Sequence, residues 1–428
     1  MKIRYFAPVA LAVICLAFTA FAATSEELAR DAASENPVTA AEAVKTLRSM
    51  GRDGLESLFV KYAAEIRDFG ETGVASDNWK RIAAAIDTVA MQRDAYASHL
   101  YWYTNLDQAK AEAKRTGKPI LSLRLLGNLN EEFSCANSRL FRSVLYSNAE
   151  IAKYLSENYV LHWKSVRPAP KVTIDFGDGR KIERTLTGNS IHYVLDADGQ
   201  IVDALPGLYS PWAFLKFITD ARAAGDAPAQ PGITRKGQYA AFRKKTFDRI
   251  AGERARDVKT AKITLTEPKT PAGSVPTAIE AAPRAMAKMI VTSEISILNS
   301  ISDDFSKYRE QLDLADWRKL ASLYAPGAKI DASALAFIKR QTRNTVTEEQ
   351  FAGLVKNLEE FAALDTTMND FLFRTRIYAV LSENNNNNLE QINERIYSEI
   401  FLTPRSDEWL GLYSPDIYTA LDGNGIVK

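Results

Sequence analysis

The sequence predicts an α/β protein with a central sheet that has helices on both faces, flanked by N-terminal and C-terminal all-α regions. Apolar residues recur at helical spacing through the first hundred residues and again after about residue 278. The stretch between these regions contains short apolar runs and Asp-Gly turns, which are typical of strands and hairpins. With 428 residues, 46% hydrophobic and 25% charged, the chain is long enough for two or three globular domains.

The first residues have the features of a secretory signal peptide, which we expect to occupy 1–22. Lys2 and Arg4 precede an apolar run, and a small-x-small triplet ends at Ala22. The alternative is an uncleaved anchor, although the apolar run is short for a membrane span. We expect a periplasmic or secreted protein with no stable membrane span after cleavage. Removal of Lys2 and Arg4 changes the formal charge from +1 to −1, which gives no reason to expect nucleic acid as a partner.

The N-terminal region, 24–103, is expected to form about four helices. Gly51 and the polar stretch at 70–78 interrupt its helical pattern. An aromatic cluster near the end of this region is either a binding surface or part of the core, and we expect packing against the central sheet because buried aromatic residues dominate such contacts. Its members are Tyr96, Tyr101, Trp102 and Tyr103.

The central region, 104–225, alternates helices and strands. Gly117 and Pro119 end a first helix, and the compact apolar run that follows is of strand length. In chain order we expect a helix at 106–116, a strand at 120–126, a helix after Cys135, a helix at 148–159, a strand at 160–166, hairpins at 171–186 and 190–207, and a helix at 210–225. This order is an α/β layout.

The remainder of the chain is divided into a connector, 226–278, and a C-terminal helical domain, 279–428. The connector is rich in Pro, Gly, Lys and Thr and contains one helical stretch at 238–259, which we expect to be solvated. The run from Asn384 to Asn388 is expected to be a polar loop between helices. Trp409 and Leu410 should attach the tail to a surface.

Cys135 is the candidate reactive residue. The other cysteine, Cys15, lies in the expected signal peptide, so the mature chain cannot form an internal disulfide. Cys135 follows a strand and opens a helix, where backbone N–H groups and the helix dipole favour a thiolate. Arg139 and Arg142 would add positive charge, whereas nearby acidic residues act against them. We expect a solvent-accessible sulfur at a helix N-terminus.

Three short stretches carry a resemblance to a known family. A helix leads into Gly117-Lys118-Pro119 and a strand, Cys135 stands after that strand, and an Asp-x-x-Gly turn at 196–199 precedes a final Gly207. Residues from about 104 to 224 thus resemble the thioredoxin-like domain of exported bacterial thioredoxin-family proteins. The chain departs from that family at two places. Ser138 stands where the resolving cysteine would be, and Ser190 stands where the family has its cis-proline.

The resemblance implies monothiol chemistry through Cys135, with Ser138 donating a hydrogen bond to the sulfur and an external partner, a protein thiol or glutathione, resolving the product. The binding residues implied are Arg139, Asn189, Ser190 and His192. The alternative is a non-catalytic module of the cell envelope, which binds another protein through the helical regions and the sheet face near Ser190.

Other ligand classes find little support. Among the three histidines, His162 and His192 lie on separate strands and could converge near Cys135 as a nucleophile pair, or could simply pack within the sheet. We expect no metal, because one thiol and scattered histidines make a poor zinc site. The Asp-Gly stretches at 175–179 and 196–199 are expected to be turns and not calcium loops. No cofactor is expected.

Overall fold

The computed structural model describes residues 23–185, 188–264, 314–342, 346–383 and 388–401, with short stretches between 403 and 426. The expected signal peptide lies outside these residues, as do the helix pattern at 278–301, the loop positions 384–387 and most of the tail. Within the described part of the chain, no helix is long and apolar enough to cross a membrane.

The N-terminal region forms five α-helices and a short 3-10 turn, one α-helix more than expected. The extra break is at Tyr62, where α3 ends and α4 begins. Gly51, at φ +69°, separates α2 from α3. The helices are α1 (Ser25–Ala32), α2 (Pro37–Ser49), α3 (Arg52–Lys61), α4 (Ala63–Thr72), α5 (Asp77–Ala90) and the 3-10 turn η1 (Ala95–Ala97). Thr24 and Ser76 cap α1 and α5, and their side chains accept hydrogen bonds from backbone N–H groups.

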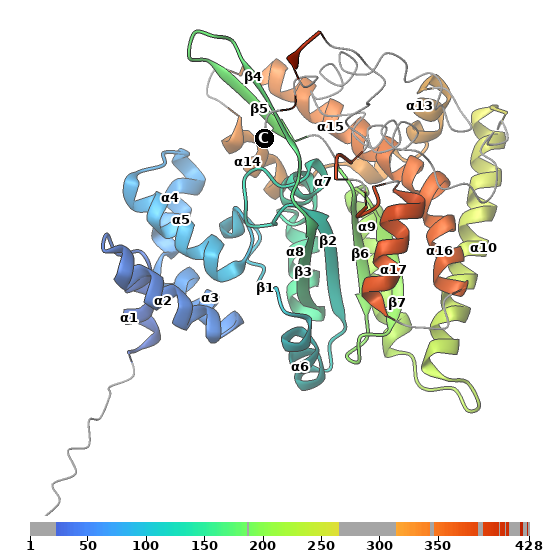
Figure 1. Cartoon of the computed structure of the whole chain (residues 1–428), viewed down its shortest axis with the longest axis horizontal. Coiled ribbons are helices and arrows are strands. Elements are labelled where there is room, and N and C mark those ends of the chain that lie inside the picture. The colour runs from blue at the N-terminus through green and yellow to red at the C-terminus, as the bar shows by residue number, and fades with distance from the viewer. Residues whose placement is uncertain are drawn as a thin grey trace, which may run out of the picture.

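A five-stranded mixed sheet lies at the centre of the molecule (Figure 1). Its strand order is β1 (Trp102–Tyr103), β3 (Val160–Arg167), β2 (Ile120–Leu126), β6 (Ser190–Leu195) and β7 (Ile201–Pro206). The first three strands are parallel, β6 runs antiparallel to β2, and β7 pairs antiparallel with β6 as a hairpin, so β7 has the same direction as the first three strands. The strand predicted at 120–126 is confirmed, and the α/β prediction is confirmed as a whole.

A second, two-stranded sheet projects from the body of the molecule as a hairpin of β4 (Lys171–Asp175) and β5 (Lys181–Thr185) (Figure 1). It lies in the chain between β3 and β6, a position in which no helix is formed. Its bend is a turn in which the Asp175 side chain accepts a hydrogen bond from the Gly177 N–H. In the turn between β6 and β7, Asp196 accepts from the N–H of Asp198 and Gln200. Both Asp-Gly stretches are therefore turns, as predicted.

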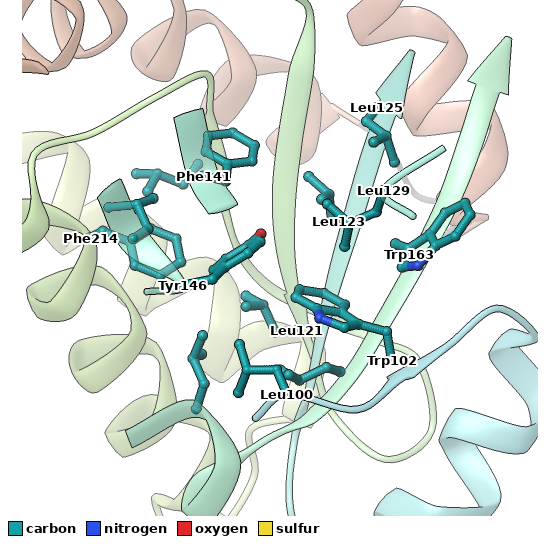
Figure 2. Close-up of a cluster of buried hydrophobic side chains, with 14 of the residues drawn as sticks. Leu100, Trp102, Leu121, Leu123, Leu125, Leu129, Phe141, Tyr146, Trp163 and Phe214 are labelled. Carbon is teal, nitrogen blue, oxygen red and sulfur yellow. The ribbon is translucent and has the colours of Figure 1, made fainter. Parts of the chain in front are cut away.

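One face of the sheet packs against helices that follow β2 and β7. These elements are α7 (Ala136–Leu140), the π-helical turn η2 (Phe141–Leu145), α8 (Ala149–Asn158) and α9 (Pro211–Asp226). Figure 2 shows Leu121, Leu123 and Leu125 in a cluster with Tyr146 and Phe214. The leucines share a face because they alternate along β2. Helix α6 (Leu106–Thr116) precedes β2.

Three of the four residues in the aromatic cluster predicted for the core are buried, and Tyr103 is half-buried. Trp102 has no exposed surface, and its indole N–H donates to Gln92 Oε1 at 2.8 Å. The rings of Trp102 and Tyr146 are 5.2 Å apart, so the end of the N-terminal region is joined to the central core. Tyr96 and Tyr101 are each 9% exposed.

The C-terminal part of the chain wraps around the sheet. It comprises α10 (Arg235–Ala261), α13 (Leu314–Ser322), η4 (Ala325–Ala328), α14 (Ala332–Gln341), α15 (Glu348–Met368), the π-helical turn η5 (Asn369–Arg374), α16 (Thr375–Glu383), α17 (Leu389–Arg395) and the π-helical turn η6 (Ile396–Ile400). Figure 1 places α17 in front of the sheet and α8 behind it.

Helix α10 corrects one expectation. The sequence predicted a solvated helix within a connector, but Tyr239, Arg243 and Ile250 are buried. The Arg243 guanidinium donates to the Ile201 carbonyl at 2.7 Å, so α10 packs against β7. The proposed domain boundaries stay a prediction.

A buried polar network joins β7 to the C-terminal helices. Arg374 lies 3.5 Å from Asp203 of β7 and 3.4 Å from Asp370. The loop after β7 is held by the same helices, since Asn369 donates to the Leu208 carbonyl at 2.8 Å. Gly207 opens this loop at φ +72°, and a β-carbon there would lie 2.5 Å from Asn369 Nδ2.

Gly207→Ala is therefore expected to lower the free energy of unfolding by at least about 1 kcal/mol, because it combines a left-handed backbone with a steric clash. The matched control is Gly353→Ala in α15, where a β-carbon meets nothing within 4 Å. This control should leave stability unchanged or raise it by about 0.5–1 kcal/mol. Urea unfolding of both variants measures the difference, and equal losses would contradict the role assigned to Gly207.

Candidate functional site

Cys135 lies where the sequence predicts, between a strand and a helix. It is the N-cap residue of α7, and its backbone N–H donates to the Leu126 carbonyl at 3.1 Å, which closes the loop after β2. Gly127 begins that loop at φ +71°, and a β-carbon there would lie 3.2 Å from the Ser134 Cα. The loop therefore requires glycine at this position.

The expectation of an accessible thiol is wrong. Cys135 has 0% exposed surface and belongs to the hydrophobic core of the described residues. Two buried tyrosines lie near it, Tyr146, which follows η2, and Tyr397 of η6. Burial, with a smaller contribution from the nearby Cys135, raises the pKa of each tyrosine well above its usual value. The sequence could not show this, because Tyr397 lies far along the chain.

Ser138 does not donate to the sulfur, which corrects a second expectation. Its hydroxyl lies 2.7 Å from Ser134 Oγ and 2.8 Å from the Cys135 carbonyl oxygen. Its proton is donated to one of these two acceptors. Arg139 donates to Thr185 Oγ1 at 2.9 Å. These contacts hold the first turn of α7 against the end of β5.

Three of the four residues expected to bind a partner, Asn189, Ser190 and His192, are buried, and Arg139 is half-buried. Asn189 and Ser190 have 0% exposed surface. Asn137 of α7 donates to Ser190 Oγ at 3.0 Å and to the Gly188 carbonyl. Cys135 is thus flanked by hydrogen-bonded polar groups and is sealed from solvent. The face near Ser190 is covered by the protein itself, so the expectation of an open docking surface there is wrong.

The two strand histidines do not converge. Ser122 and Leu123, adjacent along β2, pair in register with His162 and His192 respectively, so the two imidazoles project to opposite faces of the sheet. His192 Nε2 is hydrogen-bonded to the Tyr146 hydroxyl at 2.7 Å, and His162 Nδ1 to Ser122 Oγ at 2.9 Å. Burial lowers the pKa of each histidine to about 3. Both histidines are therefore neutral residues that pack within the sheet, and they do not form a nucleophile pair with Cys135.

Asn189 is covered by a segment from the C-terminal part of the chain. We call this segment the C-terminal strap and define it as residues 389–401 with Thr403 and Pro404. The Tyr397 hydroxyl donates to the Asn189 carbonyl at 3.2 Å, and the Asn189 amide donates to Thr403 Oγ1 at 3.1 Å. Arg167 at the end of β3 donates to the carbonyls of Thr403 and Pro404. No local pattern in the sequence indicates these contacts, because the partners lie more than 200 residues apart.

A hollow of about 540 Å³ lies beside the loop that leads to Cys135. It is found where the parallel strands β2 and β3 end, a common location for ligand sites in α/β proteins. Glu131, Phe133 and Lys171 line it together with Asn128, Ser165 and Pro168. The Lys171 ammonium lies 5.2 Å from the centre of the Phe133 ring. The hollow offers both charges and an apolar surface.

Comparison with models of protein families, with curated proteins and with solved structures gave no match to this chain. In the part of the chain that the structure describes, no cluster of three or more His, Cys, Asp or Glu side chains is arranged to hold a metal ion. The candidate site is therefore described only by the contacts between its own residues.

An ionic cluster supports the loop before Cys135 from the N-terminal region. Arg93 joins Glu132 at 3.2 Å and Asp87 at 3.7 Å, and Arg142 lies 3.8 Å from Asp94. Burial, the largest effect, raises the pKa of Asp87 to about 7, although its carboxylate accepts a hydrogen bond from a backbone N–H at 2.9 Å.

The raised pKa of Asp87 predicts a pH dependence of stability. Between about pH 4 and pH 7 the folded protein keeps a proton that the unfolded chain releases, so this group makes the free energy of unfolding fall as the pH rises through that range. Asp87→Asn removes the titration. The free energy of unfolding of the variant minus that of the native sequence is measured with urea at pH 5 and pH 8. This difference should be at least about 1 kcal/mol more favourable to the variant at pH 8 than at pH 5. Parallel pH profiles would show that Asp87 does not titrate in this range.

Proposed function

We propose that this chain is an exported, thioredoxin-like protein whose central domain binds another protein of the cell envelope and does not catalyse thiol–disulfide exchange in the conformation described above. The observation that carries this proposal is the complete burial of Cys135. A thiolate must reach the sulfur of another molecule to exchange disulfides. A sealed sulfur has no such access.

Two further features support the proposal. The chain order of helix, strand, helix, strand, hairpins and helix agrees with the layout on which the resemblance to thioredoxin-like domains rests. The hollow beside the loop after β2 provides a concave surface with Glu131 and Lys171 at its lining, next to the exposed hairpin of β4 and β5. A binding role needs such a surface and does not need a reactive thiol.

Monothiol exchange is the second candidate, and the place of Cys135 as N-cap of α7 favours it. In that reaction the Cys135 thiolate would attack a disulfide of a protein or of glutathione. The new S–S bond would form as the old one breaks, and the departing sulfur would leave as a thiolate. This candidate requires a conformation in which the sulfur is exposed.

Thiol titration of the chain without its first 22 residues distinguishes the two candidates. Because Cys135 is its one cysteine, 5,5′-dithiobis(2-nitrobenzoic acid) should detect one thiol per chain in denaturant. In the native protein, the reaction should be at least 100-fold slower than with free cysteine at the same pH. A native thiol that reacts as fast as free cysteine would support the exchange reaction and contradict the binding proposal.

The binding surface is tested with a photo-crosslinking amino acid. At Asn128, in the hollow, it should give one discrete cross-linked species in cells that export the protein. The same residue at Val60, which is 71% exposed on α3, is the control and should give none. The cross-link at Asn128 should persist in Cys135→Ala, because binding does not use the thiol. Equal cross-linking at both positions, or its loss in Cys135→Ala, would count against the proposal.

A further inference from the structure

The C-terminal strap is attached to the central sheet through a buried cation. Arg124 of β2 is 1% exposed, and its guanidinium donates to Glu390 Oε1 of α17 at 2.9 Å. The other oxygen of Glu390 lies 3.0 Å from the Lys164 ammonium. A second contact follows one helical turn along α17, where the Tyr193 hydroxyl donates to Asn393 Oδ1 at 3.2 Å. Both contacts join the strap to adjacent strands of the sheet.

Glu390 is the one carboxylate that pairs with Arg124 among the described residues. Its other terminal nitrogen donates to the neutral hydroxyl of Ser122 at 2.7 Å, and its Nε has no hydrogen-bond partner within the described part of the chain. Loss of Glu390 therefore leaves a buried cation without a counter-charge, which penalises the docked strap. An undocked strap would instead leave Arg124 open to water, so the penalty applies to the closed state alone.

The strap also carries apolar anchors, which make the closed state the resting one. Ile392, Ile396 and Ile400 recur every four residues, and each is at most 2% exposed. They lie on one face of α17 and η6, turned toward the protein. The polar end of the strap is different, since the Glu390 side chain is 50% exposed and accessible to solvent.

The same strap closes the site of Cys135. Tyr397 lies near the sulfur and donates to the Asn189 carbonyl, and Thr403 accepts from the Asn189 amide. The sulfur, Asn189 and Ser190 all have 0% exposed surface in this arrangement. Within α7, the hydroxyl of Ser138 donates to Ser134 or the Cys135 carbonyl and not to the sulfur.

We propose that the C-terminal strap is a gate for Cys135, and that the Arg124–Glu390 ion pair determines how often the gate opens. Undocking of the C-terminal strap removes Tyr397 and Thr403 from the site and exposes the thiol. The inference extends the proposed function, which describes the closed state, and it supplies the open conformation that the monothiol candidate requires.

The test measures the rate at which iodoacetamide alkylates Cys135 in the native chain without its first 22 residues, followed by mass spectrometry of the intact protein. Glu390→Gln should react at least 10-fold faster than the native sequence, because more molecules have an open strap. The matched control is Glu399→Gln, which breaks an exposed pair with Arg395 inside the strap and leaves the sheet contacts intact. Its alkylation rate should equal that of the native sequence.

Hydrogen exchange separates gate opening from general unfolding. In Glu390→Gln, amides of the strap should exchange faster while those of β2 keep their protection. If Glu390→Gln does not fold, Asn393→Ala removes the second contact and should show the same two effects. An unchanged alkylation rate with intact folding overturns the gate, as does a faster rate accompanied by equal loss of protection in β2. Fast alkylation of the native sequence would instead count against the proposed function.

Discussion

The interior of this protein contains a guanidinium that is tolerated only because a carboxylate reaches it from a distant part of the chain. Arg124 lies in a strand that is buried along its whole length, and Glu390 is 266 residues away in sequence. A buried charge that loses its counter-charge costs several kcal/mol, so the position of α17 and the integrity of β2 depend on each other. The cover over Asn189 and the burial of Cys135 follow from that docking.

The C-terminal helices therefore complete the packing of the central sheet. Between β3 and β6 the described residues form a hairpin, β4 and β5, and no helix. Helix α17 lies over the sheet instead, in front of the strands in Figure 1. A second link, between Arg374 and Asp203, fixes the C-terminal helices to β7, an edge strand of the sheet. The two ion pairs hold the same helical region to strands β2 and β7.

Much of the fold could be predicted from the sequence because its signals are local. The run at 120–126 reads as a strand, Gly117 ends α6 in a left-handed conformation, and the Asp-Gly turns close two hairpins. The break of the N-terminal helices at Tyr62 was missed, because no glycine or proline marks it. Helix α10 was taken for part of a connector because its buried residues are spaced among many charges.

The candidate site could be located but not described from the sequence. The position of Cys135 after a strand is a local feature and was predicted, whereas its burial depends on Tyr397 and Thr403, whose contacts span more than 200 residues. The sequence does contain a local sign of the buried ion pairs. Arg124 in the middle of an apolar strand indicates a buried ion pair, and Asp203 in β7 indicates another. Neither residue reveals which distant side chain is its partner.

The distance between Arg124 and Glu390 also determines when the protein can acquire its final form. During synthesis, the strands of the sheet leave the ribosome long before α17, so the part of the sheet that α17 covers stays open until that helix has been made. Contacts of such high sequence separation slow folding and favour intermediates with exposed apolar surface. In such an intermediate Tyr193 still lacks Asn393, the residue to which its hydroxyl donates in the folded protein.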